Sequence, residues 1–407
     1  MPVITKQFQN LTLPQLGFGS MRLPLLPGGG DEHVDQAAVD RMVDTAMARG
    51  ANYFDTAYGY HGGKSEVVMG KALSRYPRDS YYLASKFPGY DESNIRADKV
   101  EAIFEEQLKK CGVEYFDFYL FHNVYERNVE PYLDPKNRVV EYLLEQKRNG
   151  RIRHLGFSAH GALPVIRKFL DAVGEHMEFG QLQLNYLDTE EQAGLKGYHL
   201  AERMGVPVVV MEPVKGGLLA APPEEVEELL RAARPERTPA GWALRWAASL
   251  PGVLTVLSGM GSMAQVEENL ATFAGFTPLE PEETELLARA ADELRRRINN
   301  GCTGCEYCMP CPAGVDIPEN FSLWNKLAKC RDASLLWRSW NVVLKDEAKG
   351  KHCVGCGRCA ESCPQHTIQI REGKAVIDYK NCIRCFCCHE MCPKHVIDIR
   401  RWSVLHF

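Results

Sequence analysis

The sequence predicts a parallel (β/α)8 barrel over residues 1–280, followed by a smaller unit of different composition. Two observations support this prediction. Short apolar runs alternate with longer amphipathic stretches through the first part of the chain, which is typical of parallel strands joined by helices. Fourteen of the 15 cysteines lie beyond residue 301 of the 407-residue chain. The formal net charge of −5 is too small to indicate a nucleic-acid partner.

Eight runs have the length and apolar character of buried strands. In chain order they are 15–21, 52–57, 81–87, 116–122, 154–160, 180–185, 207–213 and 253–259. Helical patterns lie between them, for example at 35–49, 95–110 and 264–273. A doubly wound sheet is the alternative fold, but no GxGxxG motif follows the first strand.

Polar residues stand where several of these strands end, and barrel enzymes form their active sites at that edge. Asp55 and Tyr60 follow the second strand, Lys86 ends the third and His122 ends the fourth. Each residue alone would more often be a structural polar group, because charged groups are costly to bury. Four of them on consecutive strand ends favour a catalytic site.

The motifs at these strand ends resemble those of the aldo-keto reductases over about residues 2–275. They are FDTAYGY (54–60), ASKFPG (84–89), DFYLFH (117–122), GFS (156–158), QLNY (183–186) and GMGSMAQVEEN (259–269). The resemblance implies a catalytic tetrad of Asp55, Tyr60, Lys86 and His122 and a nicotinamide cofactor. The cofactor-binding residues that it implies are Ser158, Gln183, Asn185, Gly217, Ser258, Gly259, Gln265, Glu268 and Asn269.

The tetrad is chemically coherent. A tyrosine with an ordinary pKa near 10 is a weak acid, and a neighbouring ammonium lowers that pKa. Lys86 can supply the ammonium, Asp55 can hold it, and His122 can hydrogen bond to a substrate carbonyl. Tyr58 is a rival for Tyr60, which is preferred because it lies five residues after Asp55. His61 and Lys64, in the next loop, are expected to be solvated.

Three departures from the family pattern concern the cofactor. Ala159 stands where an asparagine is usual, and Met211 stands where a stacking aromatic is usual. The segment 259–265 has no Lys or Arg to bind a 2′-phosphate, so NAD(H) is favoured over NADP(H). A flavin bound by the glycine-rich loops at 215–217 and 258–261 is an alternative.

Two C-terminal runs match CxxCxxCxxxCP, the signature of bacterial ferredoxins with two [4Fe–4S] clusters. In that arrangement the last cysteine of each run binds the cluster of the other run. One cluster is therefore assigned to Cys353, Cys356, Cys359 and Cys392, and the other to Cys382, Cys385, Cys388 and Cys363. Strand-like segments at 366–370 and 374–378 are expected to cover them.

A third run, Cys302, Cys305, Cys308 and Cys311, has a shorter final spacing and is expected to bind a third [4Fe–4S] cluster. Related iron–sulfur tails leave open an exchange of Cys311 and Cys363 between clusters. Zinc is the alternative metal, but its sites usually pair two CxxC units. Cys387 and Cys111 remain as non-ligands, and Cys330 is expected to be a buried thiol.

The expected organisation is a barrel over 1–280, a helical linker over 281–350 that contains the first cysteine run at 302–311, and a ferredoxin-like domain over 351–407. No apolar N-terminal segment or membrane-spanning run is found, which favours a cytoplasmic protein.

The combined expectation is an oxidoreductase that acts on a small carbonyl-type substrate and passes electrons through [4Fe–4S] clusters, with a redox partner protein as a further expectation. A different class remains open, in which the barrel is catalytically idle and the chain is an electron-transfer subunit of a larger complex. A third alternative is that the clusters are structural or sense oxygen.

Overall fold

The computed structural model describes residues 1–297, 299, 316–336, 339–349, 368–371 and 374–377. The chain divides into two compact units. The first comprises Met1–Ala220 with Glu228–Ala291, and the second comprises Ala221–Glu227 with the residues from Asp292 onward.

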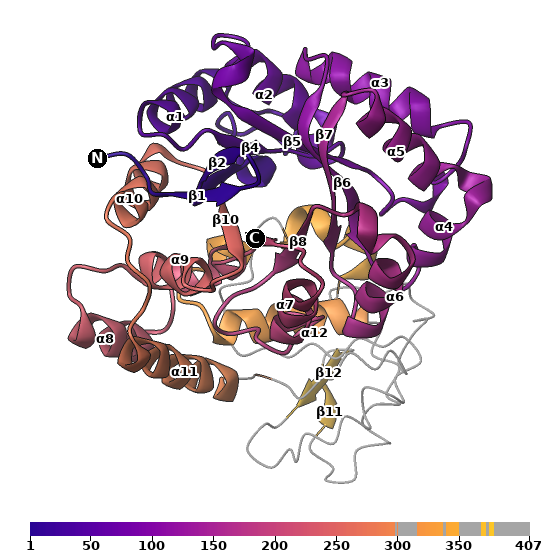
Figure 1. Cartoon of the computed structure of the whole chain (residues 1–407). Coiled ribbons are helices and arrows are strands. Elements are labelled where there is room, and N and C mark those ends of the chain that lie inside the picture. Colours follow the sequence, from indigo (N-terminus) through magenta and orange to yellow (C-terminus); the bar gives the residue numbers. More distant parts are fainter. Residues whose placement is uncertain (298, 300–315, 337–338, 350–367, 372–373, 378–407) are drawn as a thin grey trace. The chain divides into compact units, whose positions relative to one another are not determined.

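The first unit is a closed barrel with the strand order β10-β3-β4-β5-β6-β7-β8-β9, and every neighbouring pair is parallel (Figure 1). The strands are β3 (Leu16–Gly19), β4 (Tyr53–Asp55), β5 (Tyr82–Phe87), β6 (Phe116–Val124), β7 (Ile152–Ala159), β8 (Phe179–Gln183), β9 (Val208–Met211) and β10 (Val253–Gly259). Each overlaps one of the eight predicted runs. The predicted barrel is therefore confirmed, and closure excludes a doubly wound sheet.

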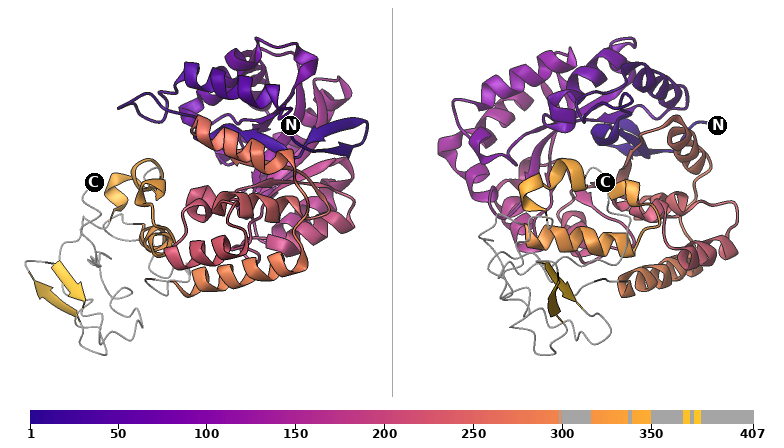
Figure 2. Two further views of the ribbon diagram at one scale, coloured as in Figure 1. Left: turned by 90° about the vertical axis from the view of Figure 1, so that its left-hand side faces the viewer. Right: turned by 180° about the vertical axis from the view of Figure 1, so that it is seen from behind.

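The helices of this unit lie outside the strands around the barrel (Figures 1 and 2). They are α1 (Gln36–Ala48), α2 (Ser65–Leu73), α3 (Val100–Cys111), α4 (Val129–Leu133), α5 (Val139–Arg148), α6 (Leu163–Val173), α7 (Gly194–Arg203), α9 (Pro239–Ala248) and α10 (Met263–Ala274). Helices α8 (Glu224–Ala233) and α11 (Pro281–Arg296) each contain residues of both units. The predicted helical patterns correspond to α1, α3 and α10. None of the helices in the described part of the chain has the length and apolar character needed to cross a bilayer.

Local sequence accounts for several of these elements. The barrel strands are apolar along most of their length because both faces of a parallel sheet are covered, one by the barrel interior and the other by helices. Asp35 caps α1 by accepting a hydrogen bond of 3.0 Å from Ala38 N. Thr238 caps α9, whose first residue is Pro239, and Ser262 caps α10.

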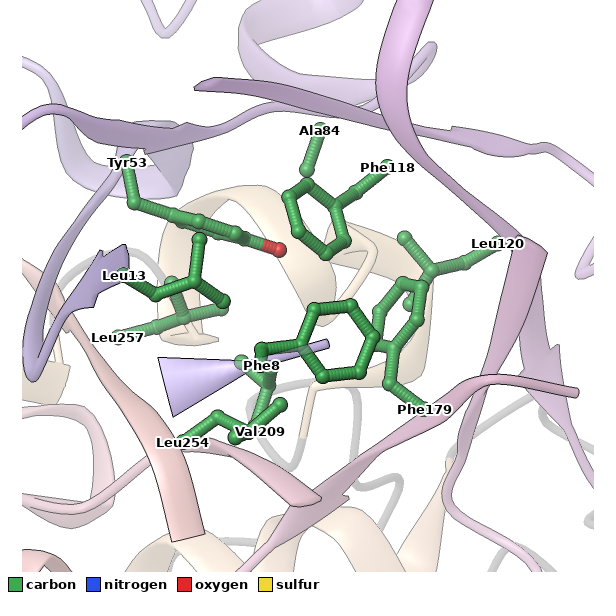
Figure 3. Close-up of a cluster of buried hydrophobic side chains, with 10 residues drawn as sticks. All are labelled: Phe8, Leu13, Tyr53, Ala84, Phe118, Leu120, Phe179, Val209, Leu254 and Leu257. Atoms are coloured by element: carbon green, nitrogen blue, oxygen red, sulfur yellow. The ribbon is translucent and has the colours of Figure 1, made fainter. Parts of the chain in front are cut away.

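A hairpin that the sequence did not predict precedes the barrel. It consists of β1 (Thr5–Phe8) and β2 (Leu11–Pro14), which pair antiparallel. Phe8 and Leu13 pack with residues from the amino-terminal part of the barrel, and the resulting group closes that end (Figure 3). The group contains Phe8, Leu13, Tyr53, Ala84, Phe118, Leu120, Phe179, Val209, Leu254 and Leu257. Strands of four residues are too short to give a periodic signal.

Glu178, just before β8, ties this hairpin to the barrel. Its Oε2 accepts hydrogen bonds of 2.8 Å from Gln9 Nε2 and 2.8 Å from His154 Nδ1, and its Oε1 lies 2.5 Å from Lys147 Nζ. Burial by itself would raise the pKa of Glu178, but these bonds outweigh it and lower the pKa to about 2.

The second unit contains α12 (Ile317–Ala328) and the antiparallel pair β11 (Ile368–Arg371) and β12 (Lys374–Ile377), which overlap the two strand-like segments predicted near the clusters. Leu323, Leu344 and Ala348 form a small buried group. Cys330 is a buried free thiol, as expected, and Cys111 in the barrel unit is also free and buried. The twelve cysteines assigned to clusters, and Cys387, lie outside the described residues.

We expect Glu178→Gln to destabilise the barrel by about 1–3 kcal/mol at pH 7, because a charged acceptor of three hydrogen bonds becomes neutral. The folded-state pKa is depressed, so this stabilisation is present above the unfolded pKa of about 4.3 and is lost as the pH falls towards 2. Urea unfolding followed at a series of pH values measures the difference. Glu175→Gln, whose side chain is 81% exposed, is the matched control. A difference in unfolding free energy that does not change with pH would contradict the depressed pKa of Glu178.

Candidate active site

An ion pair lies at the centre of the candidate site, at the carboxyl ends of two adjacent strands. Asp55 is the last residue of β4, and Lys86 lies near the end of β5. Lys86 Nζ lies 2.7 Å from Asp55 Oδ1 and donates a second hydrogen bond of 2.7 Å to Thr56 O. Lys86 is 0% exposed and Asp55 is 3% exposed. An ammonium at this depth requires such partners, because an unpaired buried charge is very costly.

The pKa shifts of this pair follow from burial and charge. Burial raises the pKa of Asp55, and the charge of Lys86 opposes that change. Burial acts to lower the pKa of Lys86, but Asp55 and Tyr60 outweigh it and leave the pKa above its ordinary value. Lys86 is therefore an ammonium at neutral pH.

Tyr60 lies against this ammonium. It begins the 3₁₀ turn Tyr60–Gly63 after β4, and Lys86 Nζ lies 5.1 Å from the centroid of its ring. Burial raises the pKa of Tyr60 by more than Lys86 lowers it, so the net shift is upward. The expected lowering by Lys86 is present, but it is not the larger effect. The phenol is thus protonated at neutral pH.

The rival tyrosine lies elsewhere. Tyr58 donates a hydrogen bond of 2.9 Å to Glu106 on α3, and Lys110 Nζ lies 3.9 Å from the centroid of its ring. Burial and Glu106 raise the pKa of Tyr58 to about 12. Of the two candidates, the structure brings Tyr60 to Lys86.

His122 faces the same group from β6. Its ring meets the ring of Tyr60 edge to face, with centroids 6.1 Å apart. Burial, Lys86 and His160 lower the pKa of His122 well below its ordinary value, so the imidazole is neutral. Ser158 supports this position, since its Oγ accepts a hydrogen bond of 2.8 Å from Asn123 N, where β6 departs from regular pairing. The four predicted tetrad residues therefore lie together.

Tyr90, which the sequence did not single out, covers one side of the group. Its ring meets His122 edge to face with centroids 5.1 Å apart. A Cβ on Gly59 would lie 2.1 Å from the Tyr90 hydroxyl, so the tyrosine in this position packs directly over that glycine. Its place near His122, four residues after Lys86, makes Tyr90 a candidate substrate contact.

Two predicted cofactor residues belong to an amide and carboxylate group after β8. Gln183 Nε2 and Asn185 Nδ2 each lie 3.2 Å from Asp188 Oδ2. Lys215 also donates to Asp188 Oδ2 and lies 3.3 Å from Glu191 Oε2. Gln183 and Asn185 are thus positioned by Asp188, which is itself buried.

The remaining predicted cofactor residues lie around the end of β10 and the start of α10. Ser258 Oγ accepts a hydrogen bond of 2.9 Å from Asn269 Nδ2. Gln265 Oε1 accepts one of 2.7 Å from Gly261 N, and Glu268 accepts one from Thr238 on α9. Gly259 ends β10, and Gly217 lies in the loop after β9 with φ 102°.

Arg22 joins these loops and was missed by the sequence analysis. It follows β3, and its side chain extends along Gly259, so that a Cβ on that glycine would lie 3.5 Å from Arg22 Cδ. A Cβ on Gly216 would lie 2.9 Å from Arg22 Nη2. The only sequence signal was a basic residue three positions after β3, in FGSMR.

A cavity of about 310 Å³ lies beside α9 and α10. Its lining includes Glu268, Arg237 and Arg245. Arg237 is paired with Glu283 at 2.8 Å, and Arg245 donates to Thr272 O at 3.2 Å. The segment 259–265 contains no basic residue, but the fold brings two arginines to this cavity. Arg245 comes from α9 and Arg237 from the segment before it.

Two regions of the chain match known protein families. Residues 15–292 match the aldo/keto reductase family, and residues 345–393 match a 4Fe-4S dicluster domain. The NADH-specific methylglyoxal reductase of Escherichia coli is 26% identical over 331 residues, covering 70% of this chain and 97% of that protein. L-galactose dehydrogenase of Arabidopsis thaliana is 27% identical over 277 residues, covering 64% and 84%.

Among solved structures, the holo form of aldo-keto reductase AKR11C1 from Bacillus halodurans is 27% identical, with a TM-score of 0.57, and the match covers 71% of this chain and 96% of that one. The family match covers more than half of the chain and includes all eight barrel strands. The predicted resemblance is confirmed: the chain belongs to the aldo/keto reductase family and carries a C-terminal 4Fe-4S dicluster domain.

Proposed function

We propose that the barrel interconverts a small carbonyl compound and its alcohol, and that the C-terminal clusters exchange the electrons of this reaction with a redox partner. The supporting observation is the buried Lys86–Asp55 pair against the protonated Tyr60, with neutral His122 beside it. This arrangement places an acid and a hydrogen-bond donor together where barrel enzymes bind substrate.

The proposed roles follow from the reduction. When hydride adds to the carbonyl carbon, the electron pair of the breaking π bond moves to the oxygen. The Tyr60 hydroxyl gives its proton to that oxygen, and the resulting phenolate is stabilised by the Lys86 ammonium. Neutral His122 donates a hydrogen bond to the same oxygen, and Asp55 keeps Lys86 charged and in place. Alcohol oxidation uses the same groups in reverse.

The residues at the barrel mouth fit a nicotinamide dinucleotide, which would supply or accept the hydride. Arg22 lies beside two glycines that leave room at the backbone, and its guanidinium suits a phosphate. Gln183, which is partly exposed, offers its amide to the ring, and Glu268 lines the cavity by α10. Asn185 is 0% exposed and its amide is bonded to Asp188 and Glu212, so we assign it a role in holding the loop. NAD(H) stays favoured over NADP(H), because Arg237 already pairs with Glu283 and Arg245 donates to two backbone carbonyls.

A flavin is the alternative occupant. It accepts a hydride and releases single electrons, which would connect two-electron chemistry to [4Fe–4S] clusters. The loop after β9 that would bind it is glycine-rich, with φ 65° at Gly216 and 102° at Gly217. Extraction of the anaerobically reconstituted protein decides whether flavin is bound.

The cluster ligands are proposed on spacing alone. The dicluster match at 345–393 spans two runs, and we assign their clusters as predicted from ferredoxin exchange of the last cysteine. The run at 302–311 lies before that match and is proposed to hold a third cluster.

We expect Tyr60→Phe to lower carbonyl turnover by about 10²–10⁴-fold, because the proton donor is lost while the fold and the clusters are kept. Methylglyoxal reduction by the anaerobic protein, with NADH and NADPH compared in parallel, measures this effect. Tyr58→Phe is the matched control and should retain activity. Unchanged turnover in Tyr60→Phe would favour the other class of function, an electron-transfer subunit with an idle barrel.

The upward pKa shift of Tyr60 predicts the pH dependence of reduction. A proton donor acts only while it is protonated, so a raised pKa moves the loss of activity to higher pH. We expect the turnover number to stay level through neutral pH and to fall only above about 10, the ordinary tyrosine pKa. An alkaline fall between pH 7 and 8 that is absent from Tyr60→Phe would contradict this.

We expect about twelve iron atoms per chain if the three cysteine runs hold three clusters, at four irons each. Iron and sulfide analysis of the anaerobically reconstituted protein gives the number. A Cys305→Ala variant should lose about four irons and retain the other clusters. About eight irons in both proteins would show that the run at 302–311 holds no cluster.

A further inference from the structure

The buried imidazole of His61 follows Tyr60 directly in the chain. Its residue is 1% exposed, so the expectation that it is solvated is wrong, whereas Lys64 is exposed as expected. His61 has φ 54° and ψ 46°, a left-handed conformation that a non-glycine residue adopts at a cost. A buried polar ring on a strained backbone is maintained only where its contacts compensate for that cost.

Those contacts are made with a different loop. His61 Nε2 accepts a hydrogen bond of 3.1 Å from Leu23 N, and Nδ1 lies 2.8 Å from Asp31 O. Asp31 Oδ1 lies 3.4 Å from the same nitrogen. Because Nε2 accepts and a carbonyl oxygen faces Nδ1, the ring is neutral and carries its hydrogen on Nδ1. Both ring nitrogens therefore hold the β3–α1 loop, defined here as residues 20–35.

The other end of this loop reaches the dinucleotide side of the proposed site. His61 binds the backbone amide of Leu23, and Arg22 is the preceding residue in the chain. The guanidinium of Arg22 lies beside Gly216. The loop is folded on itself, with a bridge between Leu25 and Val34. A shift at Leu23 consequently moves Arg22.

We propose that His61 is a positioning residue that couples the Tyr60 turn to the β3–α1 loop. It holds the Tyr60 hydroxyl and the Arg22 guanidinium in fixed positions relative to each other. Occupation of the Arg22 position by a dinucleotide phosphate then stabilises the placement of the proton donor. The binding part of this inference rests on the proposed function, whereas the coupling of the two segments does not.

The test compares His61→Leu, which removes both ring bonds, with His61→Gln, whose amide can accept from Leu23 N and donate to Asp31 O. NADH is the binding probe, followed by fluorescence quenching, and methylglyoxal is the turnover probe. His199→Leu, an exposed histidine on α7, is the control for loss of a histidine.

We expect His61→Leu and Arg22→Ala each to weaken NADH binding by about 5–30-fold and the double variant to be no weaker than the worse of the two. His61→Leu should also lower the turnover number by at least about tenfold, because Tyr60 is displaced. His61→Gln should lie within about threefold of the unaltered protein. Additive losses, or a changed melting temperature with unchanged turnover number, would overturn the proposal.

Hydrogen–deuterium exchange without any cofactor tests the coupling of the two segments separately from dinucleotide binding. In His61→Leu, exchange should rise in both 20–35 and 57–64, and a rise in only one of them would overturn the coupling. If neither the unaltered protein nor any variant binds NADH, the proposed nicotinamide site is wrong. The exchange measurement still decides whether His61 couples residues 57–64 to residues 20–35. Should His61→Leu not fold, His61→Asn, whose shorter amide reaches only one partner, is used in its place.

Discussion

The buried ion pair between Lys86 and Asp55 is the interaction on which the rest of the site depends. It can exist only because two neighbouring parallel strands end at the same level, so that a 2.7 Å contact forms away from water. The ammonium it maintains is the charge against which Tyr60 can release a proton. The same ammonium helps keep His122 neutral. Burial is the largest cause of the pKa shifts of Tyr60 and His122, and this pair of strand ends supplies the charge that modifies them.

The loops around this pair are held by bonds that cross between strands. Ser158 accepts a hydrogen bond from the irregular end of β6, and Asp188 accepts one from the Asn185 amide after β8. His61 accepts one from the loop after β3. Positive φ at Asn123, the last but one residue of β6, and at Glu212, which follows β9, belongs to the same edge. The barrel compensates for the cost of these left-handed backbone conformations at the carboxyl ends of its strands. The β1–β2 hairpin closes its opposite end.

The two matched regions imply different electron stoichiometries. Carbonyl reduction takes two electrons and two protons, delivered as a hydride and a proton, whereas a [4Fe–4S] cluster passes one electron at a time. The proposed coupling of the two regions requires a group that converts between these stoichiometries, so the occupant of the barrel mouth matters more to this proposal than the identity of the substrate. The protonated Tyr60 suits net hydride chemistry in the barrel, so the conversion is expected at the cofactor and not at the tetrad.

The sequence alone determined the barrel and the two ferredoxin-type motifs, and it singled out the four residues that the structure brings together at the strand ends. Each depends on a local pattern: alternation of strands and helices, a fixed cysteine spacing, or a polar residue at a strand end. It did not reveal the β1–β2 hairpin, whose four-residue strands are too short for periodicity, and it expected a solvated His61. Only the tertiary structure placed Arg22 beside Gly216 and Arg237 beside the cavity that Glu268 lines. These neighbours come from segments far apart in the chain, and burial, which reversed the expected pKa shift of Tyr60, is a property of the folded barrel and not of the motif.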